Sequence, residues 1–402
     1  MKRKILVLVG LAVSLSLLCG CAAFLETESY RRETFTEAPS ATPAATAGVV
    51  RSYAQLTAAI RSMVEEHLQS DVIQLQGYDG DISTDLAAAC REIQNEDPLG
   101  AYAVDYISYD LRRIVSYYEA ELFISFRRSK AQTDGIVTLS GTRALRERLT
   151  EAMAAGENYL AVYMPATTLT EANLTELARD CCYQAPGEVL LLPELEVHAY
   201  PDSGIARIFE LSMDYGLTTE ELDARQAELQ EAIQTQLERA VSAGGSLWEL
   251  AAGLRGVTAL TAEAEAWEDT AYGALVEGRC TSQGLAMAFA AVCQAGGVNA
   301  QVVEGQYQGQ ARWWVLVSLG ENRWAHCDLT ALLLGEGTVF LAGDSAMSGQ
   351  YTWDTGRYPA AEGLGDRDAP VLVMPEAEEA PAASETAPVT ENPSPSAGRT
   401  EP

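Results

Sequence analysis

The sequence predicts an α+β fold in which two tandem α/β modules precede a larger C-terminal domain. A pattern of short β-rich runs and amphipathic helices recurs at a spacing of about 90 residues in the N-terminal half. Further along, an apolar helix is followed by two β-like runs joined by "GENR", which is typical of a hairpin. All six tryptophans lie at residue 248 or beyond, which indicates that the two regions have different cores.

The chain begins with a pattern typical of secretion. In "MKRKILVLVGLAVSLSLLCGCAAF" three cations precede an apolar run and then small residues, so residues 1–20 are interpreted as a signal peptide. The apolar run is too short to span a bilayer. "LCGC" resembles the bacterial lipobox, so we expect Cys21 to become a lipidated N-terminus that anchors an extracytoplasmic protein to the bacterial cell membrane. Plain secretion, with cleavage near Ala22, is the alternative.

Two segments outside the folded part are expected to be flexible. Residues 21–47 contain the lipidated cysteine and a tether rich in Thr, Ala, Glu and Pro. Residues 366–402 form an acidic, proline-rich tail that we expect to be disordered, since seven of the fifteen prolines lie from Pro370 onward.

Charge and cysteine spacing exclude several classes of ligand. The net charge is −30, and loss of the three cations of the signal brings it to −33, so the surface repels nucleic acid and anionic lipid. The six cysteines after Cys21 have no CxxC pair and no nearby histidines at metal-ligand spacing, so neither a metal nor another cofactor is predicted. Most lie in apolar runs, which favours buried thiols over disulfides.

The N-terminal region is interpreted as a duplication. Leu56 and Leu145 each open an amphipathic helix after a short β-rich run, and Cys90 and Cys181 occupy matching places in the next helix. Two β-like runs close each copy. Chance likeness between α/β segments is the alternative. The proposed modules span residues 48–130 and 135–216, within an N-terminal region of 48–216.

Neither copy offers a convergent nucleophile, base and acid. His67 and His198 each stand alone in the sequence, which favours surface or core roles for them.

The C-terminal domain, residues 217–365, is predicted to begin with a long helix capped by Thr218 or Thr219. A second helix follows in "SQGLAMAFAAVCQAGG", with Ser282 as the expected N-cap and a glycine pair as the stop. The apolar stripes of the two helices consist of Leu222, Leu229, Ile233 and Leu237, and of Leu285, Phe289, Val292 and Cys293.

From residue 218 to about 362 the chain resembles the bacterial transglutaminase-like family, which has the fold of papain-type thiol hydrolases. The matching segments are "AYGALVEG", "QGLAMAF", "GGVNAQVVEG", "RWWVLV", "RWAHCDLT" and "FLAGDSAMSGQYTWD". The resemblance implies a nucleophilic cysteine at a helix N-terminus, a histidine base on the first hairpin strand and an aspartate that orients the histidine.

Two of the three catalytic positions depart from the family. The nucleophile position is Ser282, the base position is Arg312, and only Asp328 matches. A hydroxyl needs a neighbouring base, and a guanidinium cannot accept a proton at physiological pH. The resemblance therefore implies a non-catalytic pseudoenzyme, in which Arg312 is expected to pair with Asp328 in bidentate fashion beside Ser282.

An active thiol protease or acyltransferase is the alternative. It would use Cys280, from the loop before the helix, together with His326 and Asp328. Strand alternation is expected to place His326 and Asp328 on the same face as Trp324.

A cleft that keeps the family's shape without its chemistry would hold an extended peptide. We expect Trp313, Trp314 and Trp324 to line its rim, with burial as the alternative for each ring. The expected ligand is a peptide or protein of the cell envelope.

Overall fold

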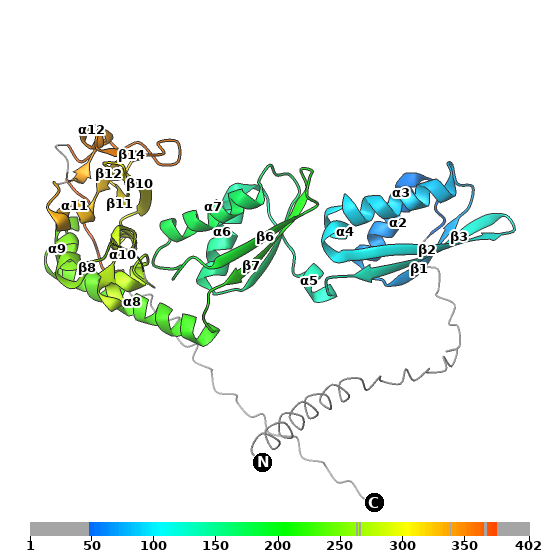
Figure 1. The fold of residues 1–402 in the computed structure, drawn as a ribbon, viewed down its shortest axis with the longest axis horizontal. Helices are drawn as coiled ribbons and strands as arrows, with labels where there is room; N and C mark the ends of the chain where they lie inside the picture. The colour runs from blue at the N-terminus through cyan, green and yellow to red at the C-terminus, as the bar shows by residue number, and fades with distance from the viewer. Residues whose placement is uncertain (1–47, 263, 265–266, 338, 366–367, 376–402) are drawn as a thin grey trace, which may run out of the picture. The chain divides into compact units, whose positions relative to one another are not determined.

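The computed structural model describes residues 48–375 except residues 263, 265–266, 338 and 366–367 (Figure 1). The signal peptide, the lipidation site Cys21, the tether and residues 376–402 of the tail therefore lie outside the described residues.

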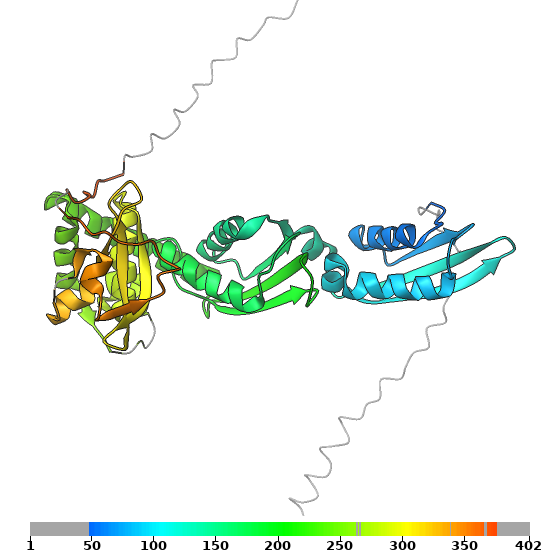
Figure 2. The same ribbon diagram turned by 90° about the horizontal axis from the view of Figure 1, so that it is seen from above.

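The first module places two helices on one face of a three-stranded sheet (Figure 2). Alternating burial along β1 and β3 directs Ile73, Leu75 and Leu122 toward these helices. Ser52 and Asp81 begin the two helices by accepting hydrogen bonds from backbone N–H groups. The elements are α2 (Tyr53–Glu65), β1 (Ser70–Leu75), α3 (Ile82–Asn95), α4 (Pro98–Ala103), β2 (Val104–Ile114), β3 (Tyr117–Phe126) and α5 (Lys130–Asp134).

The second module has the same order of strands as the first. Its sheet order is β4-β5-β7-β6, in which β5-β7-β6 corresponds to β1-β3-β2 of the first module. Both sheets pair their matching strands antiparallel. The elements are β4 (Val137–Thr138), α6 (Gly141–Ala154), β5 (Tyr159–Met164), α7 (Glu171–Gln184), β6 (Glu194–Tyr200) and β7 (Arg207–Asp214).

Individual backbone hydrogen bonds repeat with a constant offset. Val50 N–H donates to the carbonyl of Gln74 at 2.8 Å, and Leu139 N–H donates to that of Tyr163 at 2.9 Å. Both partners of the second bond lie 89 residues after those of the first. The bonds from Ile124 to Gln69 and from Met213 to Asn158 show the same offset. This agreement of backbone geometry is what a duplicated module would produce.

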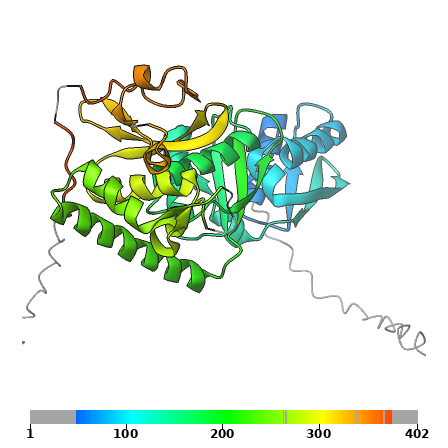
Figure 3. The same cartoon turned by 60° about the vertical axis from the view of Figure 1, so that its left-hand side comes forward.

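The C-terminal domain packs its three long helices on one face of a five-stranded sheet of order β13-β12-β11-β10-β14, and a short helix lies on the other face (Figure 3). Its helices are α8 (Thr219–Ser242), α9 (Leu247–Val257), the π-helix η2 (Gly273–Glu277), α10 (Ser282–Ala295), α11 (Leu329–Leu334) and α12 (Asp344–Met347). Its strands are β8 (Ala259–Leu260), β9 (Arg279–Cys280), β10 (Ala300–Tyr307), β11 (Gln310–Ser318), β12 (Trp324–Cys327), β13 (Phe340–Ala342) and β14 (Tyr351–Trp353).

The central helix α10 is buried on all sides. Every residue from Gly284 to Cys293 is buried, where the sequence predicted a single apolar stripe. The reason is that α10 lies between the sheet, α8 and α9. Its core continues into the second module, where Gly187 approaches Ala291 closely.

The beginning of the predicted tail is ordered by the C-terminal domain. Val371 forms a bridge to Ser246, and the side chain of Leu372 is 1% exposed against the shared core. The predicted tail boundary at 366 was therefore wrong for these residues, whose apolar side chains are buried in the core. No helix in the described ranges is both long and apolar enough to cross a membrane.

Candidate functional site

The N-terminus of α10, where the family's thiol would lie, is closed by the protein's own chain. Thr281, and not Ser282, is the N-cap: its Oγ1 accepts hydrogen bonds from Gln283 N and Gly284 N and donates to Asp269 Oδ1 at 2.6 Å. Gly284 permits this closure, because a Cβ there would lie 2.1 Å from the carbonyl oxygen of Glu268. The prediction of Ser282 as cap was wrong by one residue, since Thr281 has the extended backbone that a cap needs.

Arg312 and Asp328 form the expected ion pair, with different geometry. Arg312 Nη1 lies 3.4 Å from Asp328 Oδ2, while its Nη2 lies 2.6 Å from Glu336 Oε2. The guanidinium therefore bridges two carboxylates instead of binding one in bidentate fashion. Asp328 also accepts hydrogen bonds from Tyr351 Oη and from Ala331 N, as N-cap of α11. Burial raises the pKa of Asp328, and the charge of Arg312 opposes that rise.

Ser282 does not join this pair. No hydrogen bond or ion pair links Ser282 to Arg312 or Asp328. Side chains alternate along β11, so Arg312 shares the face of Trp314, whereas Val315 faces α10. Of the three positions that match the family triad, Arg312 and Asp328 thus form an ion pair, while Ser282 lies apart from them at the start of α10.

Cys280 is a buried thiol. It lies in the two-residue strand β9, paired with β8, and is 0% exposed, where the sequence predicted a loop position. Burial raises its pKa to about 12, so the thiolate that a nucleophile requires is disfavoured. All six cysteines of the described chain are free and buried.

His326 is also 0% exposed, and both of its ring nitrogens are engaged. Trp314 Nε1–H donates to Nδ1 at 2.9 Å, and the Nε2–H donates to Asp344 Oδ1 at 2.8 Å. This arrangement fixes the neutral tautomer with the proton on Nε2. Burial lowers the pKa of His326, and Asp344 opposes that fall. Asp328 follows the end of β12, yet Trp324, His326 and Asp328 all point to the face of Trp314 and Tyr351, as alternation predicted.

The three predicted rim tryptophans have different environments. Trp314 is 1% exposed and packs in the core, so the prediction that it lines a cleft was wrong. Trp324 is half-buried against the same cluster. Trp313 is also half-buried, donates from Nε1 to Tyr183 Oη at 3.1 Å and lines an open groove.

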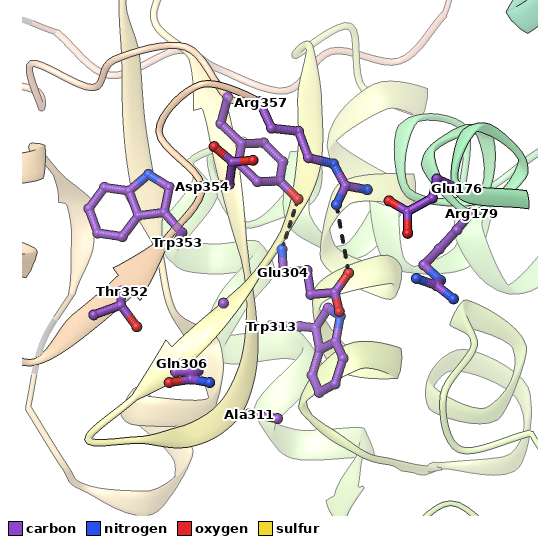
Figure 4. Close-up of a pocket in the computed structure, with 12 residues that line it drawn as sticks. Glu176, Arg179, Glu304, Gln306, Ala311, Trp313, Thr352, Trp353, Asp354 and Arg357 are labelled. Atoms are coloured by element: carbon purple, nitrogen blue, oxygen red, sulfur yellow. Dashed lines mark hydrogen bonds and ion pairs between the residues drawn. The ribbon is translucent and has the colours of Figure 1, made fainter. Parts of the chain in front are cut away.

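That groove, of about 520 Å³, lies between α7 of the second module and the β10–β14 edge of the sheet (Figure 4). Glu176 and Arg179 reach toward it from α7, opposite Glu304 and Trp313. Arg357 stands between the two sides: it pairs with Asp180 of α7 and lies 3.9 Å from Glu304. The groove therefore has one indole wall, from Trp313, and charges of both signs. Trp353 lies at its edge, with its ring packed against Trp314 and His326 on the opposite face of the sheet.

Sequence reasoning missed Trp353, Arg357 and Arg179 as groove residues. Trp353 lies in a segment that carried the family resemblance, which was the available signal. Arg179 is contributed by a different module, and nothing in its local sequence indicates the contact. Within the described ranges, no cluster of His, Cys, Asp and Glu side chains could hold a metal ion.

Comparison with known proteins gives limited information. No protein-family profile matches the chain. No curated protein matches it either. The solved structures include a similar one, titled as the crystal structure of a TGase, with 11% identity and a TM-score of 0.25; the match covers 53% of this chain and 61% of that one. The match thus spans less than two thirds of that structure.

Proposed function

We propose that the protein is a lipid-anchored, extracytoplasmic binding protein whose transglutaminase-like domain is non-catalytic and holds an extended peptide of the cell envelope. The observation that carries the non-catalytic part is the bridge of Arg312 between Asp328 and Glu336. A guanidinium held by two carboxylates cannot act as a base, and it occupies the position at which the family has histidine.

The thiol enzyme is the less favoured candidate. It needs a thiolate at Cys280 and a basic nitrogen on His326 that is open to it. Cys280 is fully buried with a raised pKa, and both nitrogens of His326 are engaged by Trp314 and Asp344. Native protein should therefore neither hydrolyse peptide amides nor transfer them. Turnover that Cys280→Ala abolishes would establish the enzyme instead.

The groove of Figure 4 supports the peptide as ligand. A peptide offers amide groups and side chains of either charge. These complement the positive charge of Arg179 and the negative charges of Glu176 and Asp354. Trp313 supplies apolar surface at little cost in side-chain entropy. The short strand β14 lies at the edge of the sheet, where an extended chain can pair with its backbone.

Site-specific photo-crosslinking in envelope membranes tests this placement. A photoreactive residue at Ala311, in the groove, should capture a peptide or protein, and Trp313→Ala should reduce the yield. The matched control carries the same residue at Trp248, an exposed position on α9 outside the groove, and should not capture that partner. Equal capture at both positions would contradict the proposal.

The anchor is tested separately. Mass spectrometry of the membrane fraction should find a lipidated Cys21 as the first residue, and an unmodified terminus at Ala22 would show plain secretion.

A further inference from the structure

The first module contains a pocket whose charge is opposite to that of the chain as a whole. The pocket measures about 580 Å³ and lies where β1 and β3 meet the start of α5. The chain has 57 acidic and 27 basic residues, yet no acidic residue lines this pocket. Its lining consists of His67, Gln69, Tyr106, Phe123, Ile124, Ser125, Phe126, Arg127, Arg128 and Ser129.

Arg127 presents a fixed cation in this pocket. Its Nε and Nη2 donate to the carbonyl oxygen of Val104 at 2.9 and 2.5 Å, which holds the guanidinium plane in place. Arg127 forms no ion pair with any acidic residue of the described chain. Nη1 and the second hydrogen of Nη2 remain as a parallel pair of donors, which is the geometry that binds a planar oxyanion.

Two further polar atoms of the lining residues lack hydrogen-bond partners. His67 Nδ1 and Arg128 Nε are buried and have no hydrogen-bond partner among the described residues. Arg128 itself is neutralised through Nη2 by Glu210, 2.6 Å away. The ring of His67 stacks on Phe126 with 3.8 Å between centroids. Unpaired buried polar groups are uncommon in folded proteins, and both of these belong to residues that line the pocket.

The backbone of His67 adds an independent observation. His67 has φ 57°, in the left-handed region, and the corresponding residue 89 positions later is Gly156 with φ 63°. Glycine occupies this conformation without strain, whereas a histidine there carries a conformational cost. Strained residues cluster at functional sites, and this one lines the pocket.

The matching residues of the second module have lost this chemistry. Register and the constant offset align Arg127 with Gly216, Phe123 with Ser212 and Ser125 with Asp214. Tyr106, which pairs with Ser125 across the sheet, corresponds to Glu194, which pairs with Asp214. The fold therefore does not require a basic, aromatic pocket here.

We propose that this pocket binds a carboxylate carried on an apolar or aromatic group, such as the C-terminus of a peptide ending in an apolar residue. Arg127 binds the carboxylate. Tyr106 and Phe123, which are 54% and 41% exposed, contact the apolar part. A single unpaired cation suits a monoanion, whereas a phosphate dianion would leave uncompensated charge in a chain of net charge −30.

Calorimetric titration of the full-length protein in detergent tests the proposal. N-acetylphenylalanine should bind saturably, and its amide should bind at least about tenfold more weakly, because it lacks the charge that Arg127 recognises. Inorganic phosphate should not compete. Arg127→Gln should weaken binding of the acid by about tenfold or more, while a cooperative thermal transition shows that the variant is still folded.

Two variants separate binding from folding and from general charge. His67→Gly, which copies the second module, should fold normally and still weaken binding. Arg113→Gln, the matched control on the same module outside the pocket, should leave binding unchanged. The proposal is overturned if acid and amide bind equally, if phosphate competes, or if Arg113→Gln and Arg127→Gln have the same effect.

Discussion

Arg312 and Asp328 form a buried ion pair in the C-terminal domain, with 3.4 Å between Nη1 and Oδ2 and with Asp328 0% exposed. The pair connects β11 to the start of α11, because Asp328 also caps that helix. It occupies two of the three positions that the sequence resemblance assigns to a catalytic triad, and we propose that its role is structural.

Removal of one partner of this pair should destabilise the domain strongly. Arg312→Met should lower the free energy of unfolding by about 3–5 kcal/mol, because Asp328 and Glu336 would lose their cation and Asp328 has no route to water. Urea denaturation measures this. The double variant Arg312→Met with Asp328→Asn should recover part of the loss, and a loss below about 1 kcal/mol in the single variant would refute a structural role.

The Cys280 thiol should be unreactive in the folded protein. Its burial and raised pKa predict slow alkylation by iodoacetamide at pH 7.5, and fast alkylation once the protein is unfolded in urea. Cys280→Ala should cost on the order of 1 kcal/mol from lost packing of a small buried side chain. Peptide mapping after a timed pulse provides the measurement, and rapid labelling of native Cys280 would reopen the thiol-enzyme reading.

The buried His326 should make the protein less stable in mild acid. Its folded pKa is lowered below 6.5, so the unfolded state takes up the proton first. The contribution of His326 to the free energy of unfolding is therefore complete above pH 6.5. It is lost as pH falls toward the folded pKa, at up to about 1.4 kcal/mol per pH unit.

His326→Gln is the matched variant, since an amide can keep a donor and an acceptor without titrating. The difference in unfolding free energy between native protein and variant should be flat above pH 6.5 and should narrow below it. A pH-independent difference would show that His326 does not titrate on unfolding. Nitrogen chemical shifts should identify the Nε2–H tautomer at pH 7.

Two glycines should respond to alanine in opposite directions. Gly156→Ala should destabilise by about 1 kcal/mol, because φ is +63° and the new Cβ would lie 3.1 Å from Leu222 Cδ1. Gly253→Ala, within α9 and with no atom nearer than 3.8 Å, should stabilise by about 0.5–1 kcal/mol. Thermal unfolding compares them, and shifts of the same sign would contradict this account.

Local patterns in the sequence were sufficient for the elements and for their repetition. Thr218 caps α8 as predicted, because capping involves only near neighbours in the chain. The equivalence of the two modules was likewise visible as a spacing, and β1-β3-β2 and β5-β7-β6 have the same strand order. The departures at Ser282 and Arg312 from the family pattern could be read from residue identity alone.

Tertiary structure decided which of these side chains meet. Trp313 and Trp314 are adjacent in sequence, yet alternation places one at a groove and the other in the core, and only the packing of α10 on one sheet face determines which. Arg179 and Arg127 gained their surroundings from segments distant in the chain. The sequence by itself determined the helix and strand patterns and the changed residues at the two family positions. The burial, hydrogen-bond partners and pKa of each site residue depend on contacts that form only when distant segments come together.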